Sequence, residues 1–90
     1  MGALSKLPNI GKELARQLTE AGITTAKELT DMGAEAAWLA IQKNDPSACL
    51  HRLLALEGAC RGVKKSLLPQ ERKEALRAFH AQHRIPPEAR

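Results

Sequence analysis

Apolar side chains recur along this chain at the three- and four-residue spacing that is typical of amphipathic helices. Ile10, Leu14, Ala15 and Leu18 form the first such stripe, which predicts a helix over residues 11–21. Further stripes, delimited by turn and cap residues, predict four more helices, over residues 25–33, 34–43, 46–61 and 69–83. The alternating pattern of a half-buried strand occurs nowhere in the sequence. The expected fold is therefore all-α, a compact five-helix orthogonal bundle rather than a long up-and-down one.

The ends of these helices carry residues with a physical reason to be there. Gly22 supplies the left-handed conformation that ends the first helix, and Thr25 and Glu28 have the spacing of a capping box. Asp45 and Pro46 suit the cap and the first position of the fourth helix. That helix has leucines on more than one stripe, so we expect it to be the central one. In the last helix we expect an inward face formed by Ala75, Leu76 and Phe79.

The length of 90 residues suits one domain, which we place at residues 1–84, followed by a mobile tail over residues 85–90. Trp38 and Phe79 are the only large aromatic residues, so the core must be built from Leu, Ile and Ala. No apolar run approaches the roughly 20 residues that a membrane span needs. These features predict a cytoplasmic protein that makes no contact with a membrane.

The net charge of +4 is distributed unevenly along the chain. Residues 1–60 carry six Lys and Arg against seven acidic residues, whereas residues 61–90 carry eight against three, a net charge of +5. This basic C-terminal part, which includes Lys64 and Lys65, is suited to the backbone of a nucleic acid. A solvated helix face would have the same composition, and the lack of aromatic neighbours argues against binding single strands by base stacking.

Side chains that could support catalysis or bind a metal are scattered. Cys49 and Cys60 fall on one predicted helix, about 16 Å apart, which is beyond the roughly 7 Å limit for a disulfide and indicates two small buried residues. His80 and His83 have no third ligand at a fitting spacing. Glu57 lies in an apolar stretch and is expected to bond a backbone N–H group or to pair with Arg61. We therefore expect no enzymatic activity, no small-molecule substrate, no cofactor and no metal.

The clearest local motif is Leu7-Pro8-Asn9-Ile10-Gly11, which precedes the first helix. It resembles the helix-hairpin-helix element, in which backbone N–H groups at a helix N-terminus hold a phosphate without reading any base. Asn9 stands where that element usually has its first glycine, and Asn is the next most tolerant residue for left-handed geometry. Lys6 and Lys12 flank the turn and could partner an anion. A helix-to-helix turn that only packs, as in sterile-alpha-motif-like interaction domains, would leave the same pattern.

A second segment, residues 29–37, has the same Leu-x-Asn/Asp-Ile/Met-Gly-x-Glu-x-Ala pattern as residues 7–15. It is either a degenerate internal duplication or a second helix start that obeys the same capping rules. Asp31 and Glu35 would repel a phosphate, so we expect this segment to be structural and any anion to bind at the first one.

Taken in order along the chain, several segments resemble the C-terminal domain of the TfoX (Sxy) family of competence regulators. They are Leu7–Gly11, Ala21-Gly22-Ile23, Leu29, Gly33 to Trp38, Asp45-Pro46-Ser47, Leu68-Pro69 and, most distinctively, Ala55-Leu56-Glu57-Gly58-Ala59. The resemblance spans about residues 7–81. It implies a helix-hairpin-helix or sterile-alpha-like fold and a bacterial protein linked to natural transformation or to competence-gene regulation. The regulators that give the family its name also carry an N-terminal domain, so a stand-alone copy could instead be an accessory module.

Two functions are compatible with these patterns. The first is contact with the backbone of double-stranded DNA through Lys6, Asn9, Ile10, Gly11, Lys12, Lys64 and Lys65. The second is a protein-interaction or self-association module of the sterile-alpha type, with a protein partner or a second copy of the chain and no DNA contact.

Overall fold

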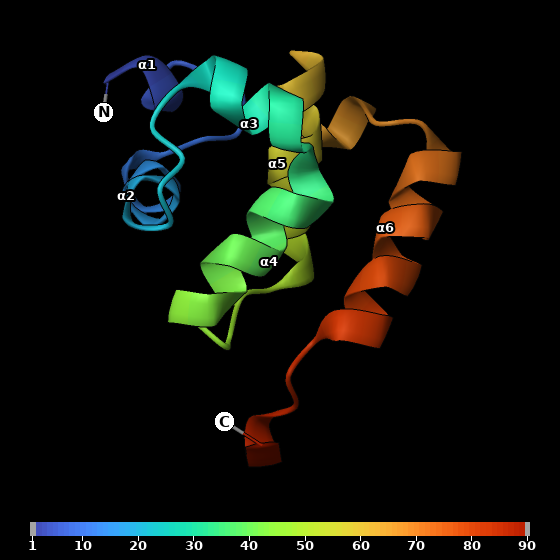
Figure 1. Ribbon diagram of the computed structural model, residues 1–90. Coiled ribbons are helices and arrows are strands. Elements are labelled where there is room, and N and C mark those ends of the chain that lie inside the picture. The colour runs from blue at the N-terminus through green and yellow to red at the C-terminus, as the bar shows by residue number, and fades with distance from the viewer. Residues whose placement is uncertain (1, 90) are drawn as a thin grey trace.

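The computed structural model describes residues 2–89, and all of their regular secondary structure is helical (Figure 1). Met1 and Arg90, the outer limits of the expected domain and tail, lie outside the described residues. The α-helices are α1 (Gly2–Ser5), α2 (Lys12–Glu20), α3 (Ala26–Met32), α4 (Ala34–Asn44), α5 (Leu50–Arg61) and α6 (Gln70–His83). Two short 3-10 helices, η1 (Lys65–Leu67) and η2 (Pro87–Ala89), complete the set.

The five predicted helices are confirmed as α2 to α6, and the all-α bundle is confirmed with them. The single-turn helix α1 was not predicted. The expected start of the fourth helix at Pro46 is wrong, because the Asp45 carboxylate accepts a hydrogen bond from the backbone N–H of Ser47 at 3.0 Å. The Ala48 N–H then bonds the Asp45 carbonyl at 3.0 Å and closes a turn. The helix α5 begins only after this turn, at Leu50.

The helix α5 is the centre of the bundle, as its leucines predict. It packs against α3, α4, α6 and η1, and Figure 1 shows α6 on one side of it and α1 and α2 on the other. The largest side chains that are fully enclosed come from almost every helix: Leu4, Leu18, Leu29, Trp38, Ile41, Leu53, Leu56 and Leu76. Burial of this apolar surface, at about 25 cal/mol per Å², is the main stabilising contribution.

Two expectations about individual side chains need correction. Ala75 is exposed rather than inward, because α6 approaches the bundle along one narrow line at Leu76, with Phe79 half-buried beside it. Cys49 lies outside α5 as its N-terminal cap, and its carbonyl accepts a hydrogen bond from the Trp38 indole at 3.1 Å. Cys49 and Cys60 are both half-buried free thiols.

Candidate nucleic-acid interface

The hairpin between α1 and α2 has the left-handed residue that its sequence predicts. Asn9 has a φ of +70°, and it is the one non-glycine residue of the described chain with a positive φ. Gly11 caps α2 with extended backbone (φ −90°) and is exposed, with no side chain that bonds the N–H groups of the first turn. The N-terminus of α2 is therefore open to solvent beside the turn.

The side chain of Asn9 points into the protein and connects the hairpin to distant parts of the chain. Its amide nitrogen donates to the carbonyl oxygens of Val63 at 3.0 Å and Ala55 at 3.4 Å. Its amide oxygen accepts from the backbone N–H of Lys65 at 3.0 Å. These bonds hold the hairpin against the middle of α5 and the connector that follows the helix. Asn9 thus has a structural role in the candidate site. Its amide is bonded to the connector and to α5, and it does not lie over the N-terminus of α2.

This arrangement depends on Gly58 in the middle of α5. A Cβ atom at Gly58 would overlap the amide nitrogen of Asn9 and would lie 2.7 Å from the carbonyl oxygen of Val63. The backbone of Val63 also donates to the Gly58 carbonyl at 2.9 Å. Only glycine lets the hairpin, the helix and the connector approach one another this closely.

The consequence is that two segments that are far apart in the sequence, the hairpin and the connector, meet at one groove. Residues 8–9 of the hairpin and residues 62–67 of the connector together line a shallow groove of about 720 Å³. We call residues 6–12 and 62–67 the hairpin–connector surface. Its four lysines, Lys6, Lys12, Lys64 and Lys65, are exposed, and none forms an ion pair with another described residue.

Other residues of the predicted site have different roles. Ile10 is only 4% exposed, and its N–H donates to the Leu7 carbonyl, so it belongs to the core and is not retained as a contact with an anion. Three other basic residues of the C-terminal part are engaged within the protein. Arg61 and Arg72 bond Glu57, and the ammonium group of Lys73 donates to the Ser66 carbonyl at 3.2 Å.

Glu57 is the centre of a buried ionic cluster with Arg61 and Arg72. Its side chain is 10% exposed and lies 2.6 Å from the guanidinium of Arg61 and 3.1 Å from that of Arg72. Burial would raise the pKa of this carboxyl, but the hydrogen bonds and charges of Arg72 and Arg61 outweigh burial and lower it. The predicted pairing with Arg61 is confirmed, and the bond to Arg72 additionally joins α6 to α5.

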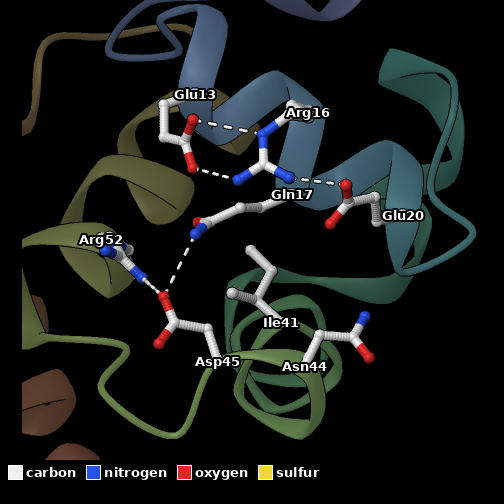
Figure 2. A pocket seen from close by; sticks show the side chains of 8 residues that line it. All are labelled: Glu13, Arg16, Gln17, Glu20, Ile41, Asn44, Asp45 and Arg52. Atoms are coloured by element: carbon white, nitrogen blue, oxygen red, sulfur yellow. Dashed lines mark hydrogen bonds and ion pairs between the residues drawn. The ribbon is translucent and has the colours of Figure 1, made fainter.

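A polar pocket of about 300 Å³ lies between α2, the end of α4 and Arg52 of α5, and the sequence did not predict it (Figure 2). Arg16 is held between Glu13 and Glu20, and the hydrogen bond from Arg16 lowers the pKa of Glu13. Across the pocket, Asp45 accepts from Arg52 at 2.6 Å and from Gln17 at 3.2 Å. Both of its guanidinium groups are bonded to carboxylates, and the Gln17–Asp45 hydrogen bond crosses the pocket, so it works as a clamp between α2 and the turn before α5.

The partners of Asp45 in this clamp strongly lower the pKa of its carboxyl group. The hydroxyl of Ser47 is the largest influence and Arg52 the next, and together they lower the pKa of Asp45 from 3.8 to about 2. Asp45 therefore stays ionised throughout the physiological range.

The second copy of the hairpin pattern does not form the same turn. Asp31, the counterpart of Asn9, lies within α3, and the left-handed residue is Gly33, with a φ of +84°. Gly33 is both the C-terminal cap of α3 and the N-terminal cap of α4. Gly11 and Gly33 thus share the role of an N-terminal cap, but the second segment does not repeat the turn of the first.

The remaining candidates for chemistry are structural. His83 stacks on Phe79 with ring centroids 4.1 Å apart, and His80 lies edge-on to Trp38 at 5.6 Å. Within residues 2–89, no three His, Cys, Asp or Glu side chains come together as metal ligands would. Over the same residues, no helix combines the length and the apolar character required to cross a bilayer.

Comparison with known proteins agrees with this architecture. The family model of the TfoX C-terminal domain matches residues 1–80. The chain belongs to the TfoX C-terminal domain family. Protein Sxy of Escherichia coli K12 is 33% identical over 73 residues, which are 81% of this chain and 35% of Sxy. This TfoX C-terminal domain therefore spans about a third of the length of that relative.

Two crystal structures from Listeria monocytogenes share the fold of this TfoX C-terminal domain. An uncharacterised protein in a triclinic form is 44% identical with a TM-score of 0.86, covering 92% of this chain and 97% of its own. A protein of unknown function in a tetragonal form is 47% identical with a TM-score of 0.86, covering 88% and 98%. The structure also explains the distinctive Ala-Leu-Glu-Gly-Ala segment, in which Glu57 anchors α6 and Gly58 admits the hairpin.

Proposed function

We propose that this TfoX C-terminal domain is a non-enzymatic module that contacts the backbone of double-stranded DNA through the hairpin–connector surface. The observation that supports this most is the Asn9 bridge. By bonding the backbone of Lys65, Asn9 holds the basic connector beside the hairpin whose Lys6 and Lys12 flank the open end of α2. As part of a TfoX-type protein, such a module fits a role in regulating competence or DNA transformation.

The chemistry of this surface suits phosphate rather than bases. Unpaired lysines attract phosphates and release counterions, and the free N–H groups at the start of α2 add a partial positive charge. Glu13 in the first turn of α2 opposes this attraction, but its charge is paired with Arg16. Trp38 is fully buried and Phe79 half-buried against it, so neither aromatic ring is available for stacking on unpaired bases.

The test is a titration of duplex DNA binding against salt. Affinity should fall with a slope near −0.9 in log units for each phosphate contacted, and it should be similar for unrelated sequences. Lys12→Glu and Lys65→Glu should each weaken binding and reduce the slope by about one contact. Lys43→Glu makes the same change of charge at the C-terminal end of α4, away from the connector, and should have a much smaller effect (Figure 1).

Two results would refute this proposal: no binding at low salt, or equal losses for Lys43→Glu and Lys65→Glu. The second candidate, a self-association module, is favoured by the exposed apolar side chain of Leu67 on the same surface. It predicts a mass that rises with protein concentration and that does not respond to Lys12→Glu. Sedimentation of the wild-type domain and of that variant distinguishes the two functions.

A further inference from the structure

The groove of the hairpin–connector surface is lined by both apolar and basic side chains. Pro8, Val63 and Leu67 supply the apolar lining, and Lys64 and Lys65 are the charged residues that line it. Leu67 is 69% exposed, although the neighbouring Leu68 is buried in the protein. Met32 is the other large apolar residue exposed within the described chain, and it does not line the groove.

This groove is held open by the fold. The Asn9 bridge fixes one wall against the connector. Along the other wall, the N–H of Leu67 bonds the Lys64 carbonyl at 2.9 Å, and Lys73 bonds the Ser66 carbonyl at 3.2 Å. A preformed groove loses little conformational entropy when it is filled, so its apolar lining is available for binding.

The charges around the groove are uncompensated. Neither Lys64 nor Lys65 pairs with a carboxylate in residues 2–89, and the nearby Glu57 is already bonded to Arg61 and Arg72. A ligand that complements this surface must therefore carry both negative charge and an apolar group.

We propose that the groove binds an acidic amphipathic segment of a partner protein. An apolar side chain of that segment would pack among Pro8, Val63 and Leu67, while its carboxylates pair with Lys64 and Lys65. The apolar lining favours a polypeptide as the ligand of the groove itself, because the phosphate backbone has no apolar group to pack there and would contact only the lysines of this surface. A second copy of this chain fits less well, because a two-fold contact centred on the groove brings the same lysines of both copies together.

This inference does not depend on DNA binding, but the two ligands share Lys64 and Lys65. A bound acidic segment would therefore exclude DNA from this part of the surface. The substitution that separates the two ligands is Leu67→Ser, which removes apolar lining and leaves every lysine in place. Because Leu67 is already exposed, the variant should fold with an unchanged thermal midpoint.

The experiment selects short random peptides, displayed on phage, against the whole domain. The enriched peptides should combine Asp and Glu with one or two large apolar residues. A selected peptide, made synthetically, should lose about tenfold in affinity to Leu67→Ser and a similar factor to Lys64→Glu. Met32→Ser and Lys43→Glu are the matched apolar and charge controls and should bind as the wild type does.

Chemical-shift mapping with the isotope-labelled domain locates the bound peptide independently, with the largest changes expected at residues 8–9 and 62–67. Failure to enrich any peptide, enrichment of peptides without acidic residues, or equal effects of Leu67→Ser and Met32→Ser would overturn the inference. Duplex DNA binding by Leu67→Ser should be unchanged, so failure of the peptide site and failure of the DNA proposal are seen in separate measurements.

Discussion

Replacing Gly58 with alanine tests the packing that brings the hairpin and the connector together. In the interior of an ordinary helix, this change stabilises a protein by about 1 kcal/mol, because alanine is the better helix former. Here the new methyl group would overlap the Asn9 amide and would lie 2.7 Å from the Val63 carbonyl. Asn9 must therefore move away, and its three hydrogen bonds to Ala55, Val63 and Lys65 are lost or weakened.

The magnitude follows from these contacts. Three hydrogen bonds at about 0.5–1.5 kcal/mol each contribute about 3 kcal/mol. Their loss exceeds the gain in helix propensity, so Gly58→Ala should lower the free energy of unfolding by about 2 kcal/mol, with residual overpacking adding to the loss. Ala36→Gly, at an exposed position of α4, calibrates the propensity change alone and should cost about 1 kcal/mol.

The assay is urea unfolding followed by helical circular dichroism and by the fluorescence of Trp38, the one tryptophan of the chain. In a double-mutant cycle, Asn9→Gly keeps the left-handed turn but removes the amide that the methyl group would strike. Gly58→Ala should cost less in that background, with only the contacts to the backbone of Val63 and Lys65 left. A stabilising effect of Gly58→Ala in the wild type, or strict additivity in the cycle, would refute the reasoning.

Three further predictions concern the charged and capped parts of the fold. Glu57→Gln removes the charged hydrogen bonds to Arg72 and should lower the free energy of unfolding, measured in urea, by about 1–3 kcal/mol. An unchanged urea midpoint would contradict the role of Glu57 in joining α6 to α5. The lowered pKa of Asp45 stabilises the fold above about pH 4, and this contribution is lost as the pH falls toward 2. Stability measured against pH should therefore fall less steeply in that range for Asp45→Asn, and an identical acid profile would argue against the clamp. Thr25→Ala removes a capping box and should cost about 1 kcal/mol in thermal unfolding, whereas Thr30→Ala on the exposed face of α3 should not destabilise.

The parts of the fold that depend on neighbouring residues were predictable from the sequence. Apolar spacing and caps such as Thr25 and Gly62 act within a few residues, so the five main helices were found. The four-residue helix α1 has too few positions to show a periodicity, and its Leu4 is buried by tertiary contacts. The start of α5 was misplaced because Asp45 bonds Ser47 and forms a turn instead of capping the helix.

The candidate site was only partly predictable, because its assembly depends on contacts between distant residues. The sequence indicated the hairpin and the basic connector separately, and nothing local shows that Asn9 bonds the backbone of Lys65. One signal was present: a glycine inside an apolar helix indicates a close approach of another backbone, and Gly58 has that role. The polar pocket beside α2 had no such signal, since Glu13 and Arg16 have the spacing of any exposed helix pair.

The Asn9 bridge also determines when the hairpin can form during synthesis of the chain. Its bond to Lys65 spans 56 residues, so the hairpin, which leaves the ribosome well before the connector, must wait for the connector before it is fixed. Contacts over such a separation form late, after the helices between them have closed the loop. A nascent chain that ends before the connector would therefore contain the whole hairpin motif but not the surface to which it contributes.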